Sequence, residues 1–134
     1  MIPKFRAYDS GSVSRMYQPD EVMVGNGDIW IIDEDSVAGE WIVNNDINLM
    51  QSTGLLDKNG KEIFEGDVVQ YQNTKVPSAD TKGVVKYFDN WAMFGIDVEY
   101  NEPRALFFNG LADHISLEVL GNIYESPELL EEEK

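Results

Sequence analysis

The sequence contains no cysteine and a single histidine, His114. Without cysteine, neither a disulfide nor a reactive thiolate can form. A zinc site built around one imidazole would lack the Cys and His ligands that such sites use, because only carboxylates remain to complete it. We therefore expect no bound metal and no cofactor.

Basic residues are also scarce. Ten Lys and Arg stand against 25 Asp and Glu, which leaves a net charge of −15. Such a charge repels phosphates and anionic lipids, so binding to the nucleic-acid backbone is disfavoured. Two interpretations of the acidic excess stay open. It is either a solvated surface, or a surface that imitates nucleic acid and occupies a basic partner.

No apolar run approaches the roughly 20 residues that span a bilayer. The segment Met1 to Lys4 lacks the apolar core of a signal peptide. We expect a soluble cytoplasmic protein with no membrane partner. A length of 134 residues suits one domain or two small subdomains that share a core.

Motifs for catalysis are missing as well. The sequence has no Walker loop, no dinucleotide-binding glycine motif and no nucleophile elbow. Asp33, Glu34 and Asp35 are consecutive, so their side chains point in different directions and no neighbour completes an oxygen cage. A calcium loop starting at Asp57 would need an acid where Val68 stands. We predict that the protein is not an enzyme and has no catalytic residues.

The sequence does contain residues that favour tight turns, between positions 49 and 71. The run Asp57 to Gly60 predicts a turn closing into a glycine bulge, since Asp can bond the backbone two residues on and Gly accepts a positive φ. A second bend is predicted at residues 65–67. The expected structural turn residues are Asp57, Asn59, Gly60, Gly66 and Asp67.

The chain alternates between apolar runs and turn signals, which predicts a mostly β protein with minor α structure. Residues 1–48 are expected to form an N-terminal β-hairpin subdomain, with a hairpin over residues 4–24. Residues 49–125 are expected to form a small SH3-like barrel. Its five short strands lie within residues 65–71, 82–87, 94–100, 104–108 and 118–125. Residues 126–134 predict an acidic helical tail that starts at Ser126 and Pro127.

Three segments carry a resemblance to a known family. They are FRAYD at residues 5–9, LMQSTGLLDKNGKEIFEGD at residues 49–67, and EVLGNIYESPELL at residues 118–130. The sequence resembles the YopX-like proteins of bacteriophages and prophages, with Tyr8 where Trp is common and Ser126 where Asn is common. The resemblance implies a mostly β fold, homo-oligomers and a phage setting, with the host bacterial cytosol as the location. No catalytic residues can be carried over from it, because the biochemical role of the family is unassigned.

Together these patterns favour a phage or prophage accessory protein that self-assembles and acts through protein contacts, with a host protein as a further possible partner. An acidic nucleic-acid mimic that modulates a host nucleic-acid-processing protein is the alternative, and a small-barrel nucleic-acid-binding module comes third. Aromatic residues are enriched in interface cores, although any single one of them more often fills the protein's own core. The candidate interface residues are Trp30, Trp41, Trp91, Phe94, Phe107 and Phe108.

Overall fold

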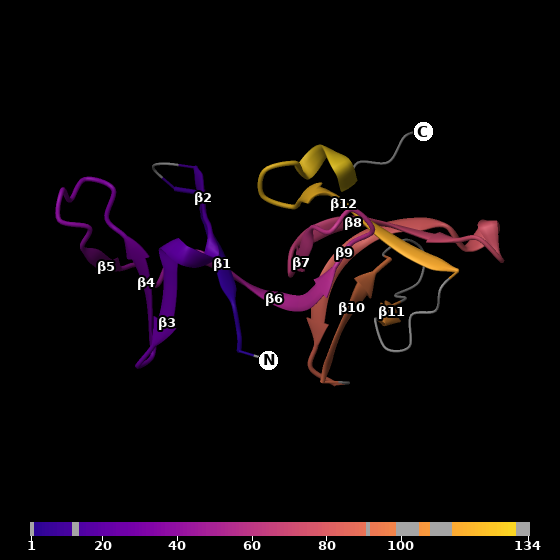
Figure 1. The fold of residues 1–134 in the computed structure, drawn as a ribbon, viewed down its shortest axis with the longest axis horizontal. Helices are drawn as coiled ribbons and strands as arrows, with labels where there is room; N and C mark the ends of the chain where they lie inside the picture. Colours follow the sequence, from indigo (N-terminus) through magenta and orange to yellow (C-terminus); the bar gives the residue numbers. More distant parts are fainter. Residues whose placement is uncertain (1, 12–13, 91, 99–104, 108–113, 131–134) are drawn as a thin grey trace. The chain divides into compact units, whose positions relative to one another are not determined.

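The computed structural model describes residues 2–11, 14–90, 92–98, 105–107 and 114–130, and of residues 105–107 the backbone alone (Figure 1). It divides into two compact units, Met1–Ser52 (unit 1) and Thr53–Lys134 (unit 2). The sequence analysis placed a boundary after residue 48, where strand β6 (Asn48–Leu56) begins. The division between the units falls inside this strand.

Strands make up 54% of the structure and helical turns 9%, which confirms the predicted mostly β class. The remaining strands of unit 1 are β1 (Phe5–Asp9), β2 (Arg15–Tyr17), β3 (Val22–Gly25), β4 (Asp28–Ile32) and β5 (Trp41–Val43). Those of unit 2 are β7 (Glu62–Phe64), β8 (Asp67–Asn73), β9 (Thr81–Phe88), β10 (Met93–Asp97), β11 (Ala105–Phe107) and β12 (Ile115–Asn122). Three short 3-10 turns complete the description: η1 (Pro19–Glu21), η2 (Pro77–Ala79) and η3 (Pro127–Leu130).

Unit 1 encloses its core between two small antiparallel sheets. One has the order β2-β1 followed by the first half of β6, and the other has the order β3-β4-β5. Both sheets send apolar side chains into a common cluster, so neither has to be stable as an isolated ribbon. The buried members of this cluster are Ala7, Tyr17, Val22, Ile31 and Ile47.

The N-terminal hairpin is shorter than the predicted span of residues 4–24. β1 pairs with β2 as expected, but the return strand ends at Tyr17 and η1 begins at Pro19. Proline has no N–H to donate to a sheet, and the Gln18 N–H is instead accepted by Glu21 Oε1 at 2.9 Å. The chain therefore turns here and starts a second sheet.

Unit 2 is built on one curled sheet of order β11-β10-β9-β8-β12, in which all strand pairs are antiparallel (Figure 1). Its five strands overlap the five predicted segments, and β12 both starts and ends three residues earlier than expected. The sheet curls into a half-barrel. Its core holds Ile63, Val69, Tyr71, Val85, Ile96, Val98 and Leu117.

Asp57 organises the turn between β6 and β7. Its backbone carbonyl accepts the Gly60 N–H at 3.0 Å, and its Oδ1 accepts the N–H groups of Asn59 at 2.9 Å and Lys61 at 2.8 Å. Gly60 has φ of +85°, as a glycine bulge requires. The other carboxylate oxygen accepts the Val119 N–H at 2.9 Å, next to the register shift in β12. One buried carboxylate therefore joins the hairpin to a strand 62 residues further along the chain.

The second predicted bend also makes long-range contacts. Gly66 has φ of +86°, donates its N–H to Val85 O and accepts the Ile123 N–H through its own carbonyl, each at 2.9 Å. Asp67 is buried, and its Oδ2 accepts the Phe64 N–H at 2.8 Å. Both bends thus fix the backbone of neighbouring strands as well as reversing the chain.

The C-terminal segment forms η3 where the sequence predicted a helix start. Ser126 precedes the turn, Pro127 is its first residue, and the Leu129 N–H is accepted by Ser126 O at 3.1 Å. Residues 131–134 of the predicted acidic tail lie outside the described part of the chain.

Replacing Gly60 with Val tests the strain at the first turn. We expect Gly60→Val to lower the free energy of unfolding by about 1–3 kcal/mol, because a β-branched residue is strained at positive φ. Gly25→Val is the matched control, since a Cβ there also meets no atom within 4 Å and its φ is not positive. Urea denaturation measures both variants. Equal midpoints for the two would contradict the role assigned to Gly60.

The Asp57 carboxylate should give stability a recognisable pH dependence. Burial by itself raises the pKa of Asp57, but N–H donation from Val119, Lys61 and Asn59 outweighs it, and the Lys61 charge adds to this, so the pKa is lowered in the folded state. The stabilisation is therefore complete above the unfolded-state pKa of about 3.9 and is lost as the pH falls through the lower folded-state value.

We expect Asp57→Asn to lower the free energy of unfolding at pH 7 by about 1.5–3 kcal/mol, the usual contribution of a hydrogen bond to a charged group. The difference from the wild type should shrink as the pH falls below about 4. Denaturant titrations of both proteins at pH 7, 5 and 3 measure it. A difference that stays constant over this range would show that the Asp57 charge does not stabilise the fold.

Candidate functional site

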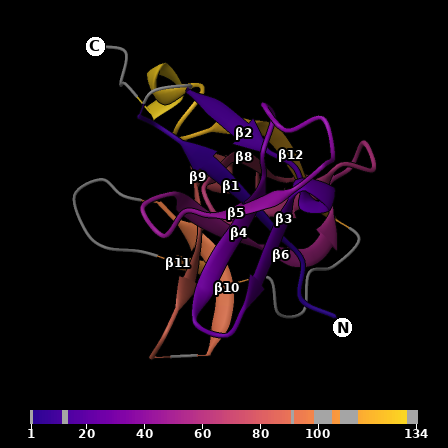
Figure 2. The same cartoon turned by 90° about the vertical axis from the view of Figure 1, so that its left-hand side faces the viewer.

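The sheet β3-β4-β5 of unit 1 carries two of the predicted interface residues, Trp30 and Trp41. A two-residue turn at Asn26 and Gly27, with φ of 54° and 79°, joins β3 to β4. Positive φ at both central residues matches the right-handed twist of a tight hairpin. β5 then pairs with the other side of β4, so that β4 is the central strand (Figure 2).

The strand register decides which side chains share a face of this sheet. Trp30 in β4 lies opposite Met23 in β3 and Val43 in β5, and Ile32 lies opposite Trp41. Residues directly opposite in an antiparallel pair project to the same side. The five side chains Met23, Trp30, Ile32, Trp41 and Val43 therefore form one surface, which we call the apolar face.

The apolar face is partly exposed on all three strands. The reverse side is mixed, since Val24 and Ile42 project from it and are 45% and 44% exposed. On the reverse side, Val22 and Ile31 are buried in the core of unit 1. On the apolar face, Met23 is 47% exposed and Val43 44% exposed. Trp30 and Trp41 are half-buried, and Ile32 is half-buried and also packs against the core cluster of unit 1. A group of adjacent, exposed apolar side chains is typical of a surface that contacts another protein.

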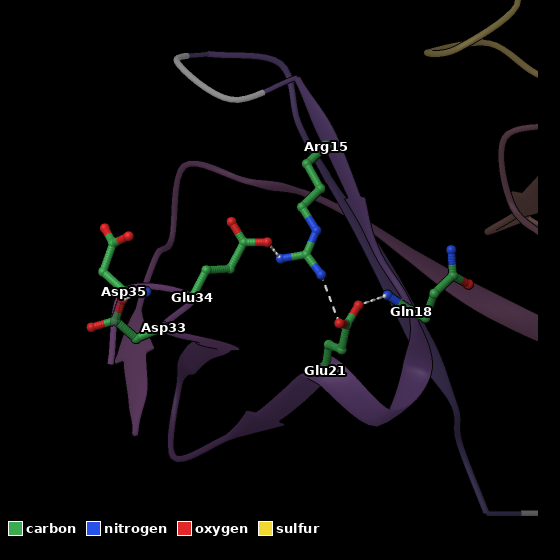
Figure 3. Close-up of polar contacts among 6 residues, drawn as sticks. All are labelled: Arg15, Gln18, Glu21, Asp33, Glu34 and Asp35. Atoms are coloured by element: carbon green, nitrogen blue, oxygen red, sulfur yellow. Dashed lines mark hydrogen bonds and ion pairs between the residues drawn. The ribbon is translucent and has the colours of Figure 1, made fainter. Parts of the chain in front are cut away.

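An ion-pair network lies in the same unit, between β2, η1 and the loop after β4 (Figure 3). Arg15 donates to Glu21 at 2.6 Å, pairs with Glu34, and stacks over the Tyr17 ring at 4.3 Å. Burial by itself lowers the pKa of Arg15, but Glu21, Tyr17 and Glu34 outweigh it and raise the pKa above its usual value. The guanidinium stays charged and its charge is neutralised locally.

The three consecutive acids of this loop do not converge. Figure 3 shows Glu34 reaching toward Arg15 and the side chains of Asp33 and Asp35 directed away from it. Asp33 Oδ1 accepts the Asp35 N–H at 3.0 Å, so that carboxylate serves the turn. In the described ranges of the chain, no three His, Asp or Glu side chains are grouped as metal binding would require.

In unit 2, the candidate interface residue Phe94 forms an aromatic pair with Tyr87 across β9 and β10. The ring centroids are 5.1 Å apart and the planes are inclined at 73°. Phe94 is half-buried and Tyr87 is 44% exposed. An edge-to-face pair of this kind stabilises the sheet that contains it. It is therefore weaker evidence for a binding surface than the apolar face.

The remaining candidate residues cannot be placed on a surface. Trp91 and Phe108 lie outside the described residues, and of Phe107 only the backbone, in β11, is described. The expected turn residues Asp57, Asn59, Gly60, Gly66 and Asp67 all belong to the two bends of unit 2. The sequence analysis missed Met23, Val43 and Tyr87 as exposed apolar residues. No local signal singles out Met23, because residues 22–24 are apolar throughout.

The family model of the YopX protein matches residues 4–131. The chain belongs to the YopX family. This confirms the resemblance drawn from the three sequence segments.

Two solved structures share the fold of the YopX family with this chain. The crystal structure of YopX from Bacillus subtilis is 22% identical, with a TM-score of 0.65 and 98% of each chain covered. That of protein EF1440 from Enterococcus faecalis is 27% identical, with a TM-score of 0.56 and 98% of this chain and 99% of that one covered. No curated protein matches the chain. Among the described residues, no helix is long and apolar enough to cross a membrane.

Proposed function

We propose that this YopX-family chain is a phage or prophage accessory protein that has no enzymatic activity, assembles with copies of itself and acts through protein contacts. The observation that carries the proposal is the apolar face. Five adjacent apolar side chains project from one side of a small sheet, and two of them are tryptophans. Tryptophan is the residue type that contributes most often to the energetic centre of protein interfaces.

Charge opposes assembly, and this gives the proposal a signature. Each added copy brings 15 more negative charges. Repulsion between exposed charges is screened by salt, with a Debye length of about 30 Å at 0.01 M and about 3 Å at 1 M. Burial of the apolar face is not weakened in this way. Association should therefore tighten as the salt concentration rises.

We expect light scattering to detect a defined homo-oligomer at tens of micromolar protein, with a lower dissociation constant at 0.5 M salt than at 20 mM. Trp30→Ser should raise this constant at least tenfold, equivalent to about 1.4 kcal/mol, because it removes the central side chain of the apolar face. Tyr87→Ser is the control, since it removes an exposed aromatic side chain from the other unit. A monodisperse monomer at both salt concentrations would contradict the proposed self-assembly.

The acidic mimic is the second candidate function. Unit 1 contains nine Asp and Glu but three Lys and Arg, a net charge of −6. One of those three cations, Arg15, is already neutralised by Glu21 and Glu34. Such a surface favours a basic protein partner. Complex formation with a basic host protein that weakens steeply with salt would favour the mimic, since self-assembly is expected to respond to salt in the opposite direction.

A nucleic-acid-binding module is the third candidate, and it can be tested directly. We expect no appreciable binding of duplex DNA or RNA at physiological salt, because a net charge of −15 opposes the release of counterions that drives such binding. Fluorescence anisotropy with a labelled duplex measures it. Binding below a micromolar that weakens steeply with salt would promote this third function above the other two.

A further inference from the structure

β5 is an edge strand of its sheet, and its sequence makes it a site for strand pairing. The sheet order β3-β4-β5 leaves one side of β5 without a neighbouring strand among the residues that the structure describes. β5 consists of Trp41, Ile42 and Val43, all half-buried or exposed. Natural proteins protect such edges with very short strands, charged residues, proline or a bulge. β5 is short, at three residues, but it contains no charged residue and no proline, and its pairing with β4 has no register shift.

The hydrogen bonds to β4 show which backbone groups of β5 face outward. The Asn44 N–H is accepted by Ile29 O and the Asp33 N–H by Glu40 O, each at 2.8 Å. Every second pair of an antiparallel ladder is a hydrogen-bonded one. The pair of Ile31 and Ile42 lies two residues from each of these two bonds, so Ile42 also directs its N–H and C=O toward β4. Trp41 and Val43 therefore direct theirs away from the sheet.

From this geometry we propose that two copies of the chain associate through their β5 strands, antiparallel about a two-fold axis at Ile42. This inference rests on the proposed self-assembly and names the surface that performs it. In this register Trp41 of each copy pairs with Val43 of the other, and the four outward N–H groups meet four outward C=O groups. If the register shifted by two residues, only one of the two outward-facing residues of each β5 would still lie opposite a residue of the other β5. The second would lose its hydrogen-bonding partner in that strand.

The same register makes the apolar face continuous across both copies. Each row of opposite residues runs across the strands of both copies. It contains Met23, Trp30 and Val43 of one copy, followed by Trp41 and Ile32 of the other. A three-stranded sheet thereby becomes a six-stranded one with two apolar rows on the same side. Aromatic residues opposite β-branched ones are favourable cross-strand pairs.

Charge is compatible with this pairing. Glu40, the acid that directly precedes β5, would lie opposite the neutral Asn44 of the other copy. The central pair, Ile42 with Ile42, is apolar. The two acidic chains can thus meet along β5 without placing a carboxylate opposite a carboxylate, which is the arrangement that destabilises strand pairs.

A single cysteine tests the register in the 134-residue chain, which has none of its own. Ile42 would form a non-hydrogen-bonded pair with its copy, with Cα atoms about 4.5 Å apart. This lies within the range of about 4.4–6.8 Å that a disulfide spans. We expect Ile42→Cys to form a covalent dimer on mild oxidation. Val24→Cys is the control, because Val24 is equally exposed, at 45%, on the opposite edge of the sheet.

A pair of proline variants tests the edge without cross-linking. Val43→Pro removes an outward N–H of β5, and Val24→Pro removes an outward N–H of β3, so both leave the hydrogen bonds to β4 in place. We expect Val43→Pro to raise the dissociation constant at least tenfold in light scattering and Val24→Pro to leave it within twofold. Circular dichroism establishes that both variants fold.

The outcomes separate this inference from the proposed function. A wild-type oligomer whose Ile42→Cys variant does not cross-link, or cross-links no faster than Val24→Cys, would overturn β5 pairing and leave self-assembly standing. A wild-type monomer at both salt concentrations would overturn both. An oligomer that Val43→Pro dissociates, together with selective cross-linking at Ile42→Cys, would establish the two-fold pairing.

Discussion

The buried carboxylate of Asp57 is the interaction on which the architecture of unit 2 depends. It accepts hydrogen bonds from Asn59 and Lys61 within its own turn and from Val119 in β12. The Lys58 N–H adds a backbone bond to Leu117 O at 2.9 Å. A neutral side chain could satisfy the turn alone. The charge lets one residue fix a local hairpin and a distant strand together, because charge-assisted hydrogen bonds are stronger than neutral ones.

Local chemistry explains why much of this fold was predictable. The positive φ values of Gly60 and Gly66 and the Asp side-chain bonds are properties of four- and five-residue segments, so the two bends follow from the sequence directly. The five strands of the curled sheet follow from apolar runs between turn signals. The link from Asp57 to Val119 was not predictable, since no local pattern shows which backbone N–H, 62 residues away, a carboxylate will reach.

The candidate surface was harder to predict for a related reason. Whether an apolar residue faces the core or the solvent is set by register and by what packs on each side of a sheet. Ile29 to Ile32 is apolar throughout, so its sequence does not distinguish Trp30 from Ile31. The structure does, because Ile31 lies opposite Val22 in the core while Trp30 lies opposite Met23 on the apolar face. Composition identified the tryptophans as candidates, and pairing was needed to group them with Val43.

A high net negative charge can offset the hazard that an apolar edge strand presents. An exposed apolar edge can pair with many strands, and this is a hazard for aggregation. A net charge of −15 makes indiscriminate association of copies unfavourable over the whole surface. Only an approach that brings apolar residues together and keeps carboxylates apart can overcome that repulsion. The antiparallel register centred on Ile42 satisfies both conditions, since it opposes Glu40 to Asn44 and Trp41 to Val43. The acidic excess can thus restrict association at β5 to one geometry, which assigns to the charge a role in specificity rather than in binding strength.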